Sequence, residues 1–173
     1  MKMRKASREM DAAFALDVFD KAPYITVSFV REDGSPYGVP LSLVRTDAKT
    51  FYFHCATEGE KVDCLRSYPE VSLSAVSRCK PTVGPRDQSF TLQYKSAMAK
   101  GIAVIVTDER EKVEALRAIS QRYLPHHMAA FDEAIKRSLD RTMVVRITLE
   151  VPPTGKRKEY AKDGHELKWG ETE

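Results

Sequence analysis

A short stretch between an aromatic strand and a helix holds the residues best suited to chemistry. The segment from Phe51 to His54 leads into a turn of small residues that includes Thr57 and ends at Gly59, and Lys61 follows. N–H groups at a helix N-terminus bind phosphate, and a nearby lysine neutralises its charge. Thr57 can add a hydroxyl donor. The spacing therefore indicates an anion site, and ordinary solvent-facing cap residues are the alternative.

Histidine and cysteine side chains next to this turn could take part in a reaction. An imidazole at His54 can donate a proton or orient a cofactor near neutral pH, or it can simply bond to backbone at a strand end. Cys55 could be redox-active, but a buried strand cysteine is usually inert, and we favour that interpretation. His126 and His127 follow Pro125 without a third ligand, which favours a solvated loop over a metal site.

Length and composition limit the functions that this chain can have. At 173 residues with 42% hydrophobic content, residues 1–173 are expected to form a single domain. A net charge of +3, spread along the chain, does not resemble the basic stripe of a nucleic-acid binder. No apolar run approaches the roughly 20 residues of a membrane span, and the start does not resemble a signal peptide. We therefore expect a soluble cytoplasmic protein.

Cysteine usage agrees with that compartment. The three cysteines are odd in number and lack the close pairing of a zinc site or a secreted disulfide framework; they are Cys55, Cys64 and Cys79. We expect free thiols and no bound metal.

The elements that must position the anion site begin with a helix and a strand. Met10, Phe14 and Val18 recur every four residues, which predicts a helix over 10–19. Alternation of apolar and polar residues over 24–30 then predicts a half-buried strand.

A second strand and a third follow through short turns. Turn residues at 33–36 connect the first strand to a strand over 37–45, so the pair reads as an antiparallel hairpin. Pro40 has no N–H group to donate to a ladder of strands. Its strand must therefore lie at the edge of a sheet, contain a bulge, or face something other than a neighbouring strand. After another turn at 47–49 comes the aromatic strand over 51–54.

The middle of the chain predicts one helix and two further strands. Helical spacing predicts a helix over 60–67, and alternation predicts a strand over 71–75. Two prolines and a glycine over 80–87 indicate a loop. A long strand over 90–107 follows, in which Gly101 suggests a bulge or a bend.

Two helices and a strand complete the predicted core. Asp108, with Glu111 three residues later, forms a cap for a helix that Pro125 breaks. Apolar spacing predicts a second helix over 128–139, and alternation predicts a closing strand over 143–149.

The last segment, 152–173, reads as a loop and a poorly packed tail, which leaves a folded core over about 10–151. Gly155, Lys156 and Arg157 form a compact basic turn that could bind a phosphate or an acidic substrate, although such charges are more often solvated. The fold class is mainly β with peripheral helices, an antiparallel barrel of about six strands. Short turns between the first strands argue against a doubly wound parallel sheet.

Several short motifs in this order resemble one protein family. They are Tyr37 to Pro40, Phe51 to Ala56, Gly59 to Lys61, Tyr68 to Val71, Tyr94 to Ser96 and Thr154 to Arg157. Together they resemble the pyridoxamine 5'-phosphate oxidase-like flavin proteins, and within that superfamily they are most similar to the nitroimidazole-resistance (Nim) branch. The resemblance extends over about residues 24–157.

The resemblance implies a six-stranded antiparallel split β-barrel that forms a homodimer, with FMN at the interface and contacts from both chains. Lys61 matches the phosphate-contacting lysine, and Pro40 lies on the strand along the isoalloxazine ring. Ser96 matches a position that in relatives reaches the cofactor, either within the same chain or from the partner chain, and His54 matches the histidine of the Nim pattern beside the redox centre. The residues implied to bind FMN are Val39, Pro40, Leu41, Ser42, His54, Cys55, Ala56, Thr57, Gly59, Lys61 and Ser96.

The implied activity is that of an FMN-dependent oxidoreductase acting on a small acceptor such as a nitro-aromatic compound or a quinone. His54 is the candidate catalytic residue, and a nicotinamide nucleotide or a separate reductase would supply electrons. Trp169 could stack on the flavin or the substrate. The arginine-rich C-terminal signature of true pyridoxamine-phosphate oxidases is missing, which argues against vitamin B6 oxidation. A flavin- or haem-binding storage module without turnover, or a barrel that has lost its ligand, are the alternatives.

Overall fold

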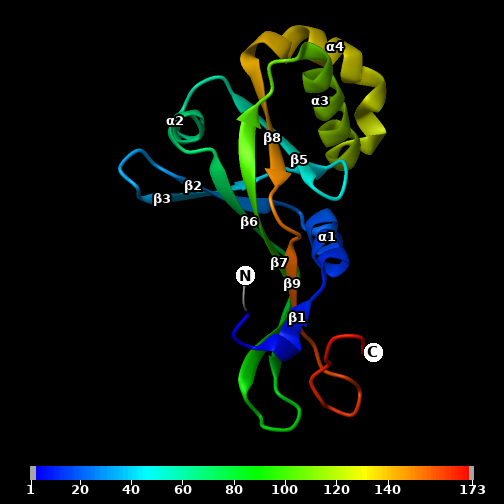
Figure 1. Ribbon diagram of the computed structural model, residues 1–173. Coiled ribbons are helices and arrows are strands. Elements are labelled where there is room, and N and C mark those ends of the chain that lie inside the picture. Colours follow the sequence, from blue (N-terminus) through cyan, green and yellow to red (C-terminus); the bar gives the residue numbers. More distant parts are fainter. Residues whose placement is uncertain (1–2, 172–173) are drawn as a thin grey trace.

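The computed structural model describes residues 3–171, which form nine strands and four α-helices (Figure 1). In chain order the elements are β1 Glu9–Met10, α1 Ala12–Lys21, β2 Ile25–Val30, β3 Pro36–Leu41, β4 Val44–Arg45, β5 Thr50–Ala56, α2 Glu60–Ser67, β6 Glu70–Val83, β7 Phe90–Ile105, α3 Glu109–Tyr123, α4 Phe131–Ser138, β8 Thr142–Leu149 and β9 Thr154–Lys158. Short 3-10 turns occupy Ala6–Arg8, Pro125–Ala130 and Leu139–Arg141.

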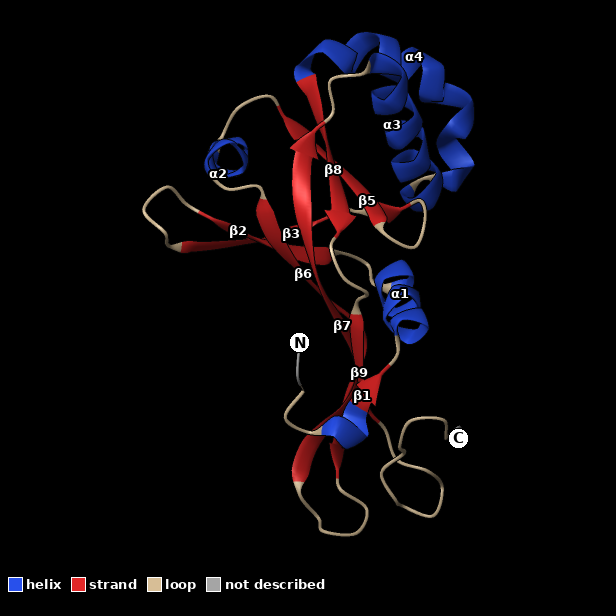
Figure 2. Cartoon of the chain, viewed as in Figure 1, coloured by secondary structure: helices blue, strands red, loops and turns tan. Residues whose placement is uncertain are grey.

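The strands form one antiparallel sheet with helices outside it (Figure 2). The strand order is β3-β2-β6-β7-β8-β5-β4, and β9 pairs with both β7 and β1. The predicted class, a mainly antiparallel β-protein with peripheral helices, is confirmed. The strands number nine in the described chain rather than six, and the sheet is not closed, which gives a split-barrel-like arrangement.

The main core lies on one side of the sheet, which we call the inner side. Alternate residues of β2, among them Val27 and Phe29, are buried there, as the alternation predicts. Helix α1 packs on the same side, and its Phe19 ring meets Phe51 edge to face with ring centroids 5.3 Å apart.

A smaller core lies on the opposite, outer side, under α3 and α4. Its buried residues are Val106, Ala115, Leu116, Phe131 and Val144. The cap of α3 is confirmed, because the Glu111 N–H donates to the Asp108 carboxylate at 2.7 Å. None of the helices within residues 3–171 is long and apolar enough to cross a membrane.

The predicted hairpin of β2 and β3 is confirmed, and its proline is explained by its place in the sheet. Pro40 lies opposite Thr26, and β3 stands at one end of the strand order. An edge strand has ladder positions without a neighbour, so a proline costs no hydrogen bond there.

Two predictions for the middle strands are wrong. The predicted loop over 80–87 is partly strand, because β6 continues to Val83 and pairs with β7 through Phe90. The irregularity in the ladder lies between Val76 and Arg78 rather than at Gly101. Gly101 instead permits close approach of β8, since a Cβ there would lie 2.7 Å from the carbonyl oxygen of Thr148.

The prediction of a loop from residue 152 is also wrong. The predicted basic turn is strand β9, which lies between β7 and β1. Gly155 is required by packing, because a Cβ there would lie 2.5 Å from the ring of Phe14 in α1. Beyond β9, Glu159 and Leu167 are each only 2% exposed, so the segment that follows is packed against the protein.

Beyond the irregularity in β6, the β6–β7 hairpin projects away from the helices (Figure 1). We call this part, residues 78–95, the arm. Its outer side carries exposed apolar residues: Val83 is 51% exposed and Phe90 is 94% exposed.

Candidate functional site

The turn before α2 has the backbone geometry of an anion site. Gly59 caps the helix with φ +111° and ψ 170°, a conformation that is open essentially to glycine alone. Its carbonyl oxygen accepts from the N–H groups of Val62 and Asp63. No side chain caps α2. The N–H groups of Glu60 and Lys61 are therefore available to an anion.

Lys61 supplies a positive charge at this turn. Its side chain is half-buried and makes no hydrogen bond or ion pair with any residue between 3 and 171. Burial raises the pKa of the Cys55 thiol, and the charge of Lys61 partly opposes that shift, so the ammonium group lies near the end of β5. Cys55 itself packs against the main core and stays a thiol at neutral pH.

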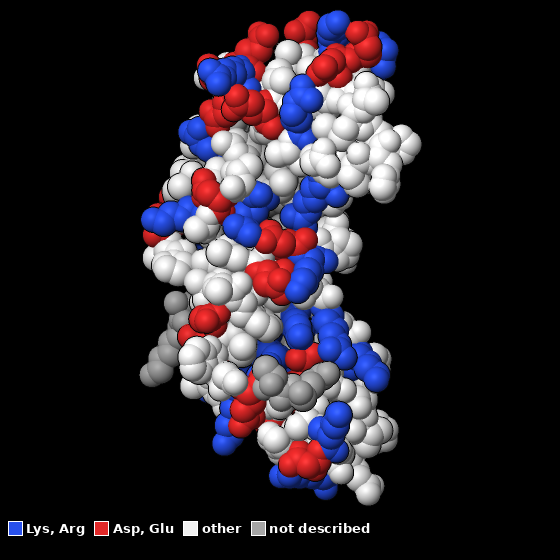
Figure 3. Space-filling model, turned by 90° about the vertical axis from the view of Figure 1, so that its right-hand side faces the viewer, with Lys and Arg blue, Asp and Glu red and all other residues white. Residues whose placement is uncertain are grey.

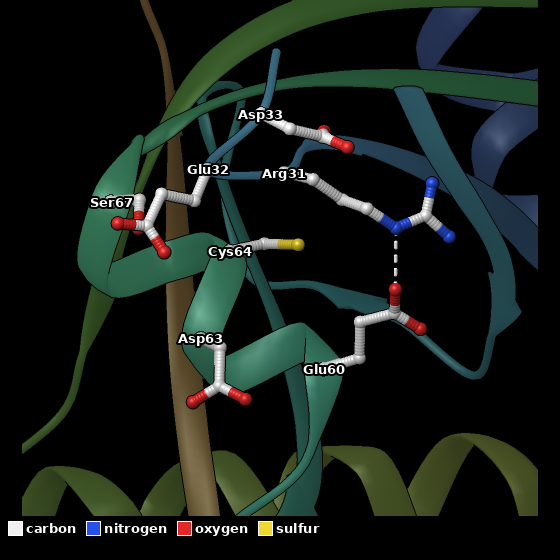
Figure 4. Close-up of a pocket in the computed structure, with 7 residues that line it drawn as sticks. All are labelled: Arg31, Glu32, Asp33, Glu60, Asp63, Cys64 and Ser67. Carbon is white, nitrogen blue, oxygen red and sulfur yellow. Dashed lines mark hydrogen bonds and ion pairs between the residues drawn. The ribbon is translucent and has the colours of Figure 1, made fainter. Parts of the chain in front are cut away.

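The other side of α2 borders a cavity of about 470 Å³ whose chemistry differs (Figure 4). It lies between α2 and the β2–β3 turn, and its lining residues are Arg31, Glu32, Asp33, Glu60, Asp63, Cys64 and Ser67. Glu60 accepts a hydrogen bond from Arg31 at 2.5 Å, which draws its carboxylate toward this cavity. The concentration of carboxylates makes this cavity unsuited to phosphate.

His54 lies in β5 on the outer side of the sheet, opposite Val144. Although the ring reaches solvent, desolvation by the surrounding protein lowers the pKa of its imidazole. The neighbouring outer-side residue is Tyr52, whose hydroxyl donates to Glu111 at 2.9 Å. Arg146 donates to the same carboxylate at 2.6 Å. A hydrogen-bonded network therefore lies beside His54.

The predicted ring-binding strand divides between the two sides of the sheet. Val39 and Leu41 pack against the main core, whereas Pro40 faces the outer side. Ser42 is exposed just after β3. The next residue, Leu43, is fully buried.

Pro40 and Ser96 reach the same side of the sheet. Pro40 in β3 lies opposite Thr26 in β2, and Thr26 lies opposite Ser74 in β6. Val76, the next residue of β6 on the outer side, lies opposite Ser96 in β7. Small side chains leave this part of the outer side open. A cavity of about 340 Å³ lies next to this region, and neither Pro40 nor Ser96 lines it; its lining residues are Ser72, Met98, Ala99, Lys100, Val151, Pro152 and Thr154.

Ser96 and His54 are not brought together within one chain. His54 lies opposite Val144, whose carbonyl oxygen accepts from the Val106 N–H. Val106 is ten residues from Ser96, and at about 3.3 Å per residue that is roughly 30 Å along β7 and its continuation.

Several residues around the site were not identified from sequence. Tyr52 alternates with His54, and that spacing could have placed both on one side of the strand. Glu111 was predicted only as a cap partner, and nothing local indicates that it bonds Arg146. No group of three or more metal-ligating His, Cys, Asp or Glu side chains occurs between residues 3 and 171.

Comparisons with known proteins identify the family and the fold of the chain. The family model described as pyridoxamine 5'-phosphate oxidase matches residues 11–152. No curated protein matches the sequence. A candidate 5-nitroimidazole antibiotic resistance protein from Bacteroides thetaiotaomicron has a similar structure, with TM-score 0.70 and 23% identity over 84% of this chain and 83% of that one.

Two further solved structures share the fold at lower identity. An FAD- and haem-binding protein from Mycobacterium smegmatis has TM-score 0.71 and 21% identity, covering 83% of this chain and 69% of that one. A flavocytochrome from Azotobacter vinelandii has TM-score 0.75 and 18% identity, and the match covers 96% of this chain and 74% of that one.

Proposed function

Because the chain belongs to the pyridoxamine 5'-phosphate oxidase family, we propose that it is an FMN-dependent oxidoreductase that reduces a small acceptor such as a nitro-aromatic compound. The observation that carries the proposal is the uncapped N-terminus of α2 at Gly59, with Lys61 beside it. The likeness to the Bacteroides protein supports the nitro-aromatic acceptor.

The residues present fit the phosphate of FMN. Apart from the residues directly before and after it, no part of the described chain lies within 4 Å of the Cβ position at Gly59, so the approach to the turn is open. The carboxylate of Glu60, which would repel a phosphate, is bonded to Arg31 instead. Lys61 supplies the charge, and the hydroxyl of Thr57 supplies a further donor.

A second copy of the chain would complete the cofactor site. Ser96 and Pro40 share the open outer side, whereas His54 is roughly 30 Å from Ser96 along the sheet. We propose a homodimer in which the β5–α2 turn of one chain faces the Ser96 region of its partner. The small side chains between Pro40 and Ser96 leave room for a flat ring there.

When bound, FMN would supply the electron transfer itself. The protein would hold the phosphate at the N-terminus of α2 and support the flavin ring along Pro40 to Ser42. A ring nitrogen of His54 would deliver a proton. Exposure to solvent lets His54 regain that proton. Its lowered pKa means that the protonated form is scarce at neutral pH and grows in acid.

The source of electrons and the compartment belong to the same proposal. A nicotinamide nucleotide or a separate reductase would reduce the flavin. Cys55, Cys64 and Cys79 are all free thiols in the structure, which supports a reducing compartment, the cytoplasm.

Lys61→Ala tests the cofactor site, with Lys49→Ala as a control that removes one charge from an exposed turn. The purified protein should be yellow, and loss of the Lys61 contact should weaken FMN binding by about 1–3 kcal/mol, measured by quenching of flavin fluorescence. Equal FMN affinity in both variants would remove the phosphate assignment. NADH- or NADPH-dependent reduction of a nitroimidazole tests the activity, and absence of turnover with every reductant contradicts it.

A flavin- or haem-binding module without turnover is the second candidate. The structural likeness to a protein named for binding FAD and haem favours it. Titration with haem, followed by the visible absorption of the bound group, separates the two. Stoichiometric haem binding together with no reductase activity would favour the second candidate.

A further inference from the structure

Two tight turns follow β9, and the first of them contacts the arm. A hydrogen bond of 2.9 Å between the first and last residues of 161–164 closes this turn, which we call the arm turn. A Cβ at Gly164 would lie 3.1 Å from Pro85, in the loop at the tip of the arm. Asp163 pairs with Arg86 of the same loop at 3.8 Å. The arm turn is therefore held against the tip of the arm.

The second turn, residues 168–171, contacts β9, and we call it the terminal turn. The N–H of Glu171 donates to the carbonyl oxygen of Lys168 at 3.2 Å, and Gly170 has the positive φ, +83°, that the third position of this kind of turn requires. The same carbonyl oxygen accepts from Nη2 of Arg157 in β9. Closure of the terminal turn therefore supplies an acceptor to a buried guanidinium group.

His165 lies between the two turns and contacts a carboxylate of each. Its Nδ1 is 2.6 Å from the carboxylate of Asp163, and its Nε2 is 3.3 Å from that of Glu171. Because ionised carboxylates only accept, the imidazole can bond both of them only when both of its nitrogens carry a proton. The neutral ring has one N–H group, so its other nitrogen would repel a carboxylate oxygen. The observed arrangement is that of the positively charged ring.

Charged groups from other elements surround this contact. Figure 3 looks onto the side of the molecule where the C-terminal segment lies, and acidic and basic side chains lie next to one another in its lower part. From the arm, Arg86 faces the carboxylate of the arm turn. From the segment before β1, Arg8 and Lys5 instead hold Glu166, at 2.7 and 3.6 Å. Within the terminal turn, Lys168 faces the carboxylate of Glu171.

We propose that the terminal turn is a clip that is closed while His165 carries a proton and opens when the proton leaves. In the open form Glu171 separates from the imidazole, and the carbonyl oxygen of Lys168 leaves Arg157. The arm turn stays in place, because its contacts with the tip of the arm do not involve the imidazole. None of these residues belongs to the proposed flavin site, so the clip does not depend on flavin activity.

The direction of the pH dependence follows from the same contacts. The hydrogen bond to Asp163 is the largest cause that raises the pKa of His165 above 6.5, and the bond to Glu171 adds to it against the effect of desolvation. A raised pKa in the folded protein stabilises the closed form fully below pH 6.5, and this stabilisation is lost as the pH rises through the folded value. The clip therefore opens in mildly alkaline solution.

Emission of Trp169, the single tryptophan of the chain, reports on the terminal turn that carries it. In the full chain the emission should shift in one step between pH 5 and pH 9, with a midpoint above 6.5. His165→Gln should remove the step, because glutamine does not titrate in this range. Glu171→Gln should lower the midpoint. His126→Gln, at an exposed histidine on another segment, is the matched control and should keep the step unchanged.

Hydrogen exchange of the wild type gives a second readout that needs no variant. The Lys168 N–H donates to Glu171 at 2.7 Å, so its protection, corrected for the intrinsic effect of pH, should fall about threefold or more between pH 6 and pH 8.5. Constant emission and constant protection over this range would overturn the clip. A step that survives His165→Gln, or that His126→Gln removes equally, would also overturn it.

Discussion

The hydroxyl of Tyr123 donates a hydrogen bond to the carbonyl oxygen of Leu43 at 2.8 Å. This contact joins the end of α3 to the chain directly after Ser42, where the proposed ring-binding strand ends. The peripheral helix therefore fixes the position of a segment that is proposed to bind the cofactor.

Tyr123→Phe should weaken FMN binding with little loss of fold. Removing one hydrogen bond of this kind costs about 1 kcal/mol, and the freed carbonyl lets the segment at Ser42 move. Tyr24→Phe, at a tyrosine that is 55% exposed, is the matched control. Equal FMN dissociation constants for the two variants, measured by flavin fluorescence, would show that Tyr123 does not position the site.

Arg122→Ala should destabilise the fold. Its guanidinium donates to the carbonyl oxygens of Phe19, Asp20 and Ala22 at 2.9 to 3.0 Å, which close the C-terminal end of α1. We expect a loss of about 1–3 kcal/mol in urea unfolding. Arg110→Ala, at an exposed position of α3, the helix that also carries Arg122, should lower the free energy of unfolding by less than about 0.5 kcal/mol. A similar midpoint for both variants would contradict this role.

Gly59→Ala should strain the turn that is proposed to hold the phosphate. An added Cβ meets no atom within 4 Å, so the cost comes from the backbone conformation alone, about 1–3 kcal/mol. Gly38→Ala is the control, because its Cβ makes only ordinary contacts, 3.7 Å from Ser28. If Gly59→Ala left both the melting temperature and FMN affinity unchanged, the turn would not need this geometry.

His54→Gln should make the protein less sensitive to mild acid. Desolvation lowers the pKa of His54 in the fold, so the unfolded chain binds the proton first as the pH drops below about 6.5. The wild type therefore loses stability as the pH falls through the window between 6.5 and the lower folded pKa. His165 has a raised pKa, caused first by its hydrogen bond to Asp163, and contributes in the opposite direction.

Comparing urea midpoints of the wild type and His54→Gln from pH 8 to pH 5 isolates the contribution of His54. If the urea midpoints of the two proteins changed equally with pH, His54 would not contribute to the acid sensitivity. If His54 also delivers the proton, reductase activity should rise as the pH falls toward its pKa, and the variant should lose that rise.

The segment around α2 could be predicted from sequence because its signals are local. Gly59 and Pro69 bound the helix, and the predicted bounds over 60–67 match α2. The predictions are wrong where the structure of a segment depends on pairing with a strand distant in the sequence. Pro81 favours a loop, yet it lies in β6 opposite Leu92. The arm has only two strands, so the other edge of β6 has no neighbouring strand there and tolerates proline.

The pairing of β9 and the spread of the site also depend on distant contacts. Gly155 lies in a strand because it pairs with Met10 and Ala97, and no residue near Gly155 in the sequence indicates those partners. Likewise, the resemblance assigned Ser96 and His54 to one cofactor, but only the register of β7 reveals that they lie far apart in one chain.

The irregularity between Val76 and Arg78 decides the chemistry of the arm. Before it, Val76 lies opposite Ser96; after it, Arg78 lies opposite Lys95. The one extra residue therefore exchanges which side chains of β6 face each way. It gathers the charged side chains with Lys95 on one side and leaves Val83 with Phe90 on the other. Deleting Ser77 would turn Val83 toward the side of Glu159 and Arg78 away from it, whereas Lys95 and Phe90 on β7 would keep their sides.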